Sequence, residues 1–321
     1  MSNTHGMTPT NSAIFGGSLR IPGEKAAAKT VVRATWKPRQ RWRAFSSKLF
    51  FFTSLMATVL AVAALIYLLQ SVAEQGLDRV SWSFITSFPS RFPAKAGVKA
   101  ALWGSAYLTA LTAAIAVPIG VGAAVYLEEF AADSKLRRFI DINIANLAGV
   151  PSIVYGMLGL MLFVRICNFG RSLLAGAATM SLLILPIIIV ASREALKTIP
   201  MGIRHAAFGL GATRWQTVRA HVLPSALPGI LTGVILSLSR AVGETAPLLM
   251  IGALSYMAFV PETPMDAFTV LPIQIFNWTA RPQDEFHVTA AAGIIVLLAL
   301  LLTVNALAIF MRMRYQRKAQ W

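Results

Sequence analysis

The sequence predicts an all-α integral membrane protein with six transmembrane helices. Hydrophobic residues make up 56% of the 321 residues, charged residues make up 13%, and the mean hydropathy is +0.64. A soluble chain of this length has about a quarter of its residues charged, so this chain cannot cover its apolar surface in water. Two further observations support the prediction: a series of long uncharged runs, and an uneven distribution of Lys and Arg between them.

Residues 1–48 form a polar, basic segment before the first uncharged run. They contain nine Lys and Arg against one acid, Glu24, and show no helical periodicity. This composition predicts a disordered cytoplasmic tail whose last part lies against anionic lipid head groups. The domain boundary is therefore placed at residue 49, with a six-helix membrane domain over 49–315.

Six uncharged, apolar windows follow the tail. A transmembrane helix needs about 20 apolar residues, so each window predicts one span. The windows are Leu49–Leu69, Ala100–Leu127, Ile142–Val164, Ser172–Ser192, Val222–Ser239 with its continuation after Glu244, and Val288–Met311. Prolines within them predict kinks that neighbouring helices accommodate. These prolines are Pro118, Pro151, Pro186 and Pro247.

Positive charge lies mainly on one side of the predicted spans. With the N-terminus inside, segments 1–48, 128–141, 193–221 and 312–321 carry 21 Lys and Arg, and the outside segments carry 7. This excess is a positive-inside signal, so it predicts that both termini are cytoplasmic. The net charge of +16 therefore lies at loops and helix ends, which argues against nucleic acid as a partner.

The outside loop 255–287 is the longest connection between predicted spans. A short helix is expected near Phe268–Phe276. The loop is either a landing surface for an external partner or a packed cap over the helix bundle, and composition does not separate these two interpretations.

Residues 199–224, which we call the elbow, form a polar island between two apolar runs. Ile203–Leu210 is rich in alanine and predicts a short helix, and Gly211 suits a left-handed stop after it. Thr213 and Gln216 have the spacing of a capping box, which predicts the start of a second short helix. Helices this short are unstable alone in water, so the pair needs a surface to lie on.

The elbow resembles a signature of the membrane subunits of ABC importers. That family carries Glu-Ala-Ala, then a glycine four residues later, then a final Leu-Pro, in a cytoplasmic loop that docks on the ATPase. The residues that match this pattern in position are His205, Ala206, Ala207, Gly211, Leu223 and Pro224. His205 and His221 stand where the family has Glu and Ile. The resemblance implies a coupling loop over 193–224 that contacts an ATPase; an ordinary amphipathic interfacial loop is the alternative.

The fifth predicted span contains two ionisable residues, Arg240 and Glu244. A span from about Leu227 to Met250 places Arg240 near the middle of the bilayer, where an arginine costs about 2.5–3.5 kcal/mol to insert. The two residues are four apart, so they can pair along one helix face. They either lock the bundle as an ion pair or form a polar station on a substrate path. A guanidinium fork matches phosphate or carboxylate oxygens, so an anionic substrate fits best.

Residues 240–249 are similar to the corresponding stretch of phosphate-specific ABC permeases. The Ala-Pro-Leu-Leu ending and the later run Leu271–Trp278 resemble the A-type permease subunit, and the likeness covers about residues 50–315. It implies a type I ABC importer permease fold in the bacterial inner membrane, with Arg240 and Glu244 on the phosphate path. It also implies a heterodimer with a second, homologous permease subunit, two ATPase subunits that bind ATP, and an external phosphate-binding protein.

The sequence contains no G-x-x-x-x-G-K-[ST] motif, so we expect no P-loop for ATP in this chain. It has one cysteine, four scattered histidines and no H-E-x-x-H motif, so we expect neither a metal site nor a histidine-based catalytic site. The expected protein is a non-catalytic subunit without a cofactor of its own. The alternatives are a permease for another oxyanion (sulfate, molybdate or phosphonate), a secondary transporter or channel, and a membrane scaffold or sensor.

Overall fold

The structure is a computed structural model that describes residues 39–254 and 256–318. Within these residues the secondary structure is helical, without strands. The chain divides into two compact units, Met1–Ala64 and Leu65–Trp321.

The helices are α1 (Arg39–Gly76), η1 (Leu77–Arg79), α2 (Trp82–Thr86), η2 (Pro93–Lys95), α3 (Lys99–Val125), η3 (Tyr126–Phe130), α4 (Lys135–Ala148), α5 (Ser152–Gly159), η4 (Leu160–Ile166), α6 (Leu173–Lys197), α7 (Met201–Gly209), α8 (Arg214–Thr217), η5 (Val218–Val222), α9 (Leu223–Gly243), α10 (Ala246–Ile251), α11 (Leu271–Thr279) and α12 (Asp284–Lys318).

The first helix, α1, begins ten residues before the predicted domain boundary. Residues 1–38 of the predicted tail lie outside the described residues, but residues 39–48 are helical, so the prediction of disorder is wrong for them. This stretch contains neither Gly nor Pro and is rich in Arg, Ala, Gln and Lys, which are good helix formers. The helix of the first apolar window therefore continues into the basic segment.

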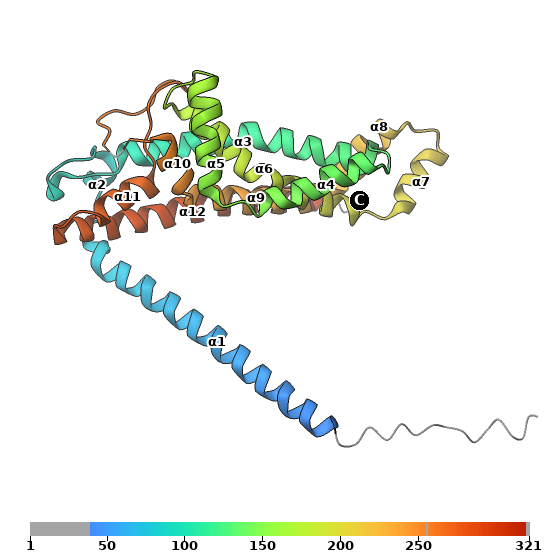
Figure 1. The fold of residues 1–321 in the computed structure, drawn as a ribbon, viewed down its shortest axis with the longest axis horizontal. Helices are drawn as coiled ribbons and strands as arrows, with labels where there is room; N and C mark the ends of the chain where they lie inside the picture. The colour runs from blue at the N-terminus through green and yellow to red at the C-terminus, as the bar shows by residue number, and fades with distance from the viewer. Residues whose placement is uncertain (1–38, 255, 319–321) are drawn as a thin grey trace, which may run out of the picture. The chain divides into compact units, whose positions relative to one another are not determined.

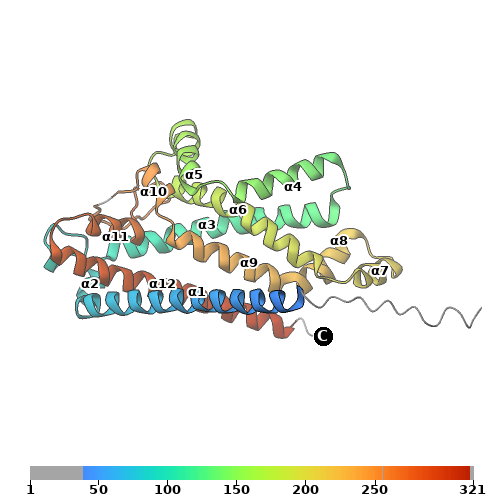
Figure 2. The ribbon, with the colours of Figure 1, turned by 60° about the horizontal axis from the view of Figure 1, so that its bottom comes forward.

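In the second unit, four long helices lie side by side. α3 packs on α6, α6 on α9, and α9 on α12 (Figures 1 and 2). Small residues allow this close packing: a β-carbon added to Gly120 of α3 would lie 2.7 Å from Ile188 Cγ2 of α6. One added to Gly233 of α9 would lie 2.4 Å from the Ala191 Cβ of α6. The backbones of α3 and α9 therefore approach α6 from two sides.

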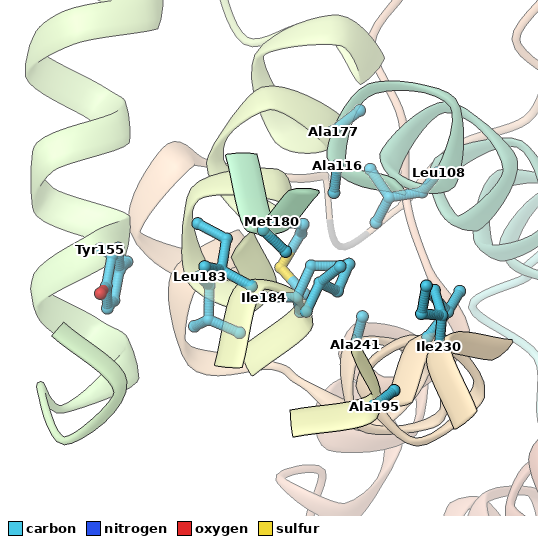
Figure 3. Packing of buried hydrophobic residues seen from close by; sticks show 14 of the residues in the cluster. Leu108, Ala116, Tyr155, Ala177, Met180, Leu183, Ile184, Ala195, Ile230 and Ala241 are labelled. Carbon is cyan, nitrogen blue, oxygen red and sulfur yellow. The ribbon is translucent and has the colours of Figure 1, made fainter. Parts of the chain in front are cut away.

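The main hydrophobic core follows α6. Figure 3 shows Met180, Leu183 and Ile184 of this helix within the cluster, with Ala116 of α3 and Ile230 of α9 on one side of them and Tyr155 on the other. In the most apolar window of α6, 67% of the residues are buried, against 33% in the corresponding windows around α3 and α9. α6 is thus the central element that holds its neighbours in place.

Among the described residues, five helices are long and apolar enough to cross a membrane, and there are six candidate spans if the bent pair formed by α4 with α5 and η4 counts as one. The predicted span over Ile142–Val164 is bent far more sharply than a proline kink, because the chain turns by 103° between α4 and α5. Gly149 ends α4, and Pro151 lacks the N–H that would bond the Leu147 carbonyl. The Tyr155 hydroxyl donates to that carbonyl instead, at 2.8 Å.

The predicted helix in loop 255–287 is present as α11, shifted by three residues along the chain. Phe268, just before it, is fully buried. The backbone N–H of Leu271 donates to the buried Ser105 hydroxyl of α3 at 2.9 Å, so another helix caps the start of α11. This part of the loop is therefore a packed cap over the helix bundle, which was one of the two interpretations of the sequence.

Candidate functional site

The predicted polar station lies where α9 ends. α9 stops at Gly243 and α10 starts three residues later, at Ala246. Pro247 explains the break, because it has no N–H to bond the Gly243 carbonyl and its ring would clash with that carbonyl. Arg240 is therefore in the last turn of a helix, and the prediction of a continuous span from Leu227 to Met250 around it is wrong.

Arg240 and Glu244 form an ion pair at this break. Arg240 Nε lies 3.3 Å from Glu244 Oε1, and their side chains are 53% and 17% exposed. Glu244 has extended backbone, so the pair spans the helix end and does not run along a helix face. This is the only polar contact that the Arg240 side chain makes with the described residues, and its Nη groups remain available to another acceptor. A cation here also opposes the negative end of the helix dipole.

Arg240 belongs to an open face of α9. Ser225, Leu236 and Gly243 share this face with Arg240 and are exposed like it. Residues on other faces pack against α6, as Gly233 does. Within the described part of the chain, Arg240 is the only charged residue on this open face of α9.

Two polar contacts join α9 to α12 beside the station, and the sequence reasoning missed both. The Ser239 hydroxyl donates to Asn305 Oδ1, and Arg312 Nη1 donates to the Thr232 hydroxyl at 3.0 Å. The two contacts are seven residues apart on each helix, in opposite directions, as antiparallel packing requires. A lone amide inside an apolar window, Asn305, was the available signal.

The elbow adopts the predicted corner. Gly211 follows α7 with φ of +83°, in the left-handed region. Thr213 and Gln216 form a full capping box: the Thr213 hydroxyl accepts from the Gln216 N–H at 3.3 Å, and the Gln216 side chain accepts from the Thr213 N–H at 2.8 Å. Both local predictions are confirmed.

The second elbow helix was predicted to be a separate short helix. In the structure it continues into the span. α8, η5 and α9 form one helix over Arg214–Gly243. η5 is a π-helical segment that ends directly before Leu223 and Pro224. Its wider turns accommodate the proline, which cannot donate to the preceding turn. The elbow is thus attached rigidly to α9 on one side and through the short segment 198–200 to α6 on the other.

The six elbow residues that were singled out differ in exposure. His205, Ala206, Gly211 and Pro224 are exposed, Leu223 is half-buried and Ala207 is buried. The most exposed large apolar side chain near the corner is that of Leu210, which is 91% exposed. The surface of the elbow is thus apolar at its tip.

A buried arginine that the sequence reasoning missed braces the elbow. Arg204 Nη2 and Nε lie 2.6 and 3.2 Å from the two carboxylate oxygens of Glu129 in η3. The same guanidinium donates to the carbonyls of Ile199, at 2.7 Å, and Leu196, at 3.2 Å. The elbow is therefore braced by Arg204 without a carboxylate at position 205. The available signal was the pair of acids directly after the second apolar window.

A metal site is not indicated. Within residues 39–254 and 256–318, no group of three or more His, Cys, Asp or Glu side chains is arranged to hold a metal ion.

Comparison with known proteins connects these features to a family. Residues 116–317 match the family described as the binding-protein-dependent transport system inner membrane component. The chain is 31% identical over 266 residues to the probable ABC transporter permease protein YqgI of Bacillus subtilis (strain 168), covering 78% of this chain and 90% of that protein. It is 31% identical over 303 residues to the phosphate transport system permease protein PstA 1 of Mycobacterium tuberculosis (strain ATCC 25618 / H37Rv), covering 92% and 96%. Identity to PstA of Yersinia pestis is 32% over 274 residues, covering 85% and 92%.

Solved structures share the fold. A chain of the bacterial ABC transporter involved in the import of the acidic polysaccharide alginate matches with a TM-score of 0.60 at 15% identity, covering 85% of this chain and 98% of that chain. A chain of the inward-facing MetNI methionine ABC transporter matches with a TM-score of 0.52 at 23% identity, covering 70% and 96%. The fold is that of an ABC importer permease, a multi-pass membrane protein. The chain belongs to the family of binding-protein-dependent transport system inner membrane components.

Proposed function

We propose that this chain is a permease subunit of an ATP-driven importer that moves inorganic phosphate into the cytoplasm. The observation that supports phosphate as the substrate is the sequence identity to two permeases named for phosphate transport. It is 31% and 32%, over 92% and 85% of this chain. Arg240 supplies fitting chemistry, because a guanidinium with free Nη donors binds two phosphate oxygens at once.

The open face of α9 is the proposed wall of the phosphate path. Helix breaks at membrane depth are tolerated where they line a cavity or are covered by protein. A second, homologous permease subunit would close the path from the other side. The distribution of Lys and Arg supports cytoplasmic termini and a cytoplasmic elbow, in a bacterial inner membrane.

Energy for transport comes, in this proposal, from two ATPase subunits that dock on the elbow. The exposed apolar tip at Leu210, with Phe208 beside it at 43% exposure, suits insertion into a groove of a partner. An external phosphate-binding protein delivers the substrate at the opposite end of the bundle. This chain then contributes the path and the elbow, without catalysis of its own.

The test replaces Arg240 in the complete complex. We expect Arg240→Gln to lower uptake of radiolabelled phosphate into proteoliposomes by at least tenfold while the ATPase subunits still copurify, because the neutral side chain cannot attract the anion. Arg138→Gln is the matched control: Arg138 is exposed on α4 and makes no ion pair with the described residues. Uptake by Arg240→Gln at the level of this control would contradict the assignment.

A reversed pair separates a path from a structural ion pair. Arg240→Glu with Glu244→Arg keeps opposite charges together, so a structural pair would retain much of its function. A path residue would not, because the cation moves past the helix end. Competition by sulfate, molybdate or phosphonate stronger than by phosphate would assign the path to another oxyanion.

A further inference from the structure

We propose that the ion pair of Glu129 with Arg204 transmits elbow movement to the helix bundle, and that Arg193 forms a second link in the same chain of contacts. Both arginines act as positioning residues, since neither lies at the proposed phosphate path. The inference rests on the proposed docking of ATPase subunits at the elbow. It adds the residues by which a movement there reaches the station at Arg240.

α7 has few other attachments. Of its nine residues only Arg204 and Ala207 are buried. A cavity of about 310 Å³, lined by Glu129, Arg204 and Phe208 among others, separates part of α7 from η3. Because side chains do not fill this space, van der Waals packing passes little force across it. The hydrogen-bonded ion pair is the direct connection at this place.

The geometry of the pair fixes orientation as well as distance. Arg204 and Glu129 meet through two contacts, and both side chains are 10% exposed. A two-point fork resists rotation in a way that a single contact does not. The other donors of Arg204 hold the carbonyls of Leu196 and Ile199 at the end of α6. One side chain thus joins α7, η3 and the end of α6.

The neighbouring acid carries the connection to α4. Glu128 Oε2 lies 3.4 Å from Arg193 Nε of α6 and 3.6 Å from Arg137 Nη2 of α4. Arg193 also holds Asp141 of α4, with Nη2 to Oδ2 at 3.3 Å. None of the residues of α4 is fully buried, although Ile140 and Ile144 pack against the core, and the ionic contacts are its directional attachments to the bundle. A shift of η3 therefore reaches α4.

From α4 the contacts lead back to the station. α4 continues through the 103° bend into α5, where Gly156 lies against α10. A β-carbon on Gly156 would be 2.7 Å from the Pro247 Cα, so the two backbones touch. Pro247 follows Glu244 by three residues. Spatial continuity does not demonstrate coupling, so the test measures coupling itself.

The test uses the complete transporter with Arg204→Met and Glu129→Gln together. Removing both charges leaves no unpaired charge in a buried place, which protects folding. We expect the ATPase subunits to copurify at native levels, and phosphate transported per ATP hydrolysed to fall at least tenfold. The single variants Arg204→Met and Glu129→Gln should show the same defect as the double variant, because they break the same link. Arg138→Gln is the control and should couple like the native chain.

The outcomes separate this link from the proposed function. Native coupling in the assembled double variant would overturn the link and leave the docking proposal intact. Absence of any ATPase bound to the native chain would instead overturn the docking proposal. If the double variant Arg204→Met with Glu129→Gln fails to bind the ATPase subunits, the ion pair builds the docking surface. That result would also overturn the proposal that the pair transmits movement. As a second measurement, Asp141→Asn should lower coupling in the same direction, whereas an unchanged ratio would remove Arg193 from the chain of contacts.

Discussion

Arg204 and Arg240 are both arginines paired with a glutamate, but their surroundings differ. Arg204 is 10% exposed and meets Glu129 at two points, whereas Arg240 is 53% exposed and meets Glu244 through one contact of 3.3 Å. An exposed single contact contributes about 0–1 kcal/mol and is easily exchanged for another anion. A buried fork is costly to break. The first pair suits a fixed link and the second suits a station that releases and accepts anions.

Asp266 offers a residue-scale prediction on pH. Its carboxylate accepts from the Thr263 N–H at 2.8 Å, the Thr263 hydroxyl at 2.7 Å and the Glu262 N–H at 2.8 Å, and these hydrogen bonds lower its pKa below the ordinary value. Because the pKa is lower in the folded chain, the ionised carboxylate stabilises the turn at pH values above the ordinary carboxyl pKa. This stabilisation is lost as the pH falls through the lowered pKa of the folded state. We expect Asp266→Asn to lower the melting temperature at pH 7.

The pH dependence of that difference is the check. Melting of the native chain and of Asp266→Asn in detergent should converge as the pH falls from about 4 through the lowered pKa of Asp266, because the carboxyl is then protonated and neutral like the amide. A melting difference that stays constant from pH 7 to pH 3 would show that the charge of Asp266 does not hold the turn.

Local sequence patterns predicted one ion pair and missed the other. Arg240 and Glu244 are four residues apart, so their pairing was predictable, although the end of the helix between them was not. Arg204 and Glu129 are 75 residues apart. No periodicity in the sequence relates two positions at that distance, and only the packing of α3 and the elbow against α6 brings them together.

At the scale of elements, the prolines sort into two groups. Pro151 and Pro247 stand at breaks, whereas Pro118 and Pro186 remain inside the continuous helices α3 and α6. The breaking prolines follow a glycine by two and four residues, Gly149 and Gly243, and the others do not. Glycine weakens a helix by about 1 kcal/mol, which adds to the hydrogen bond that proline removes. The sequence predicted bends at all four, and a glycine shortly before the proline accompanies the two bends that become breaks.

The two glycines of α3 give an element-scale prediction. A β-carbon on Gly120 would lie 2.7 Å from Ile188 Cγ2, but one on Gly122 has no neighbour within 4 Å. We expect Gly120→Ala to destabilise the chain by about 1–3 kcal/mol through overpacking against α6. Gly122→Ala should be neutral or slightly stabilising, because alanine favours a helix. Thermal unfolding of the isolated chain in detergent compares the two, and equal melting temperatures would disprove the close contact of α3 with α6.

At the scale of the whole molecule, the apolar windows predicted the spans, and Pro151 predicted a kink in the third, but its size of 103° was not predicted. Hydropathy measures how long an uncharged run is, and it is insensitive to a change of direction within the run. The helix start at Arg39 was missed for a related reason: the basic segment has helix-forming residues without apolar periodicity. The described part of the chain contains five candidate spans and one bent pair, and their arrangement across the membrane is a prediction.

Reporter fusions test that arrangement. We expect a reporter after Asp133 to be inside, one after Gly170 to be outside, and one at the C-terminus to be inside, because the bent pair then crosses once and the positive-inside signal is kept. Fusions at Asp133 and Gly170 that report the same side would show that α4 and α5 do not cross together. The Arg138→Gln variant can carry the same reporters as a check that a single charge does not invert the topology.

The π-helical segment η5 holds one residue more than α-helical winding would need between α8 and α9. It lies between Thr217 and Leu223 and contains the wider turns of that helix. Deleting one residue there would restore α-helical winding and leave the rotation of α8 against α9 nearly unchanged, because a π turn uses one residue more than an α turn for the same rotation. Trp215 would then stay beside Phe130, whose ring lies 6.4 Å away. Deleting one residue inside the α-helical part of α9 would instead turn α8 by about 100° and separate the two rings, so the place of a deletion in this helix matters more than its length.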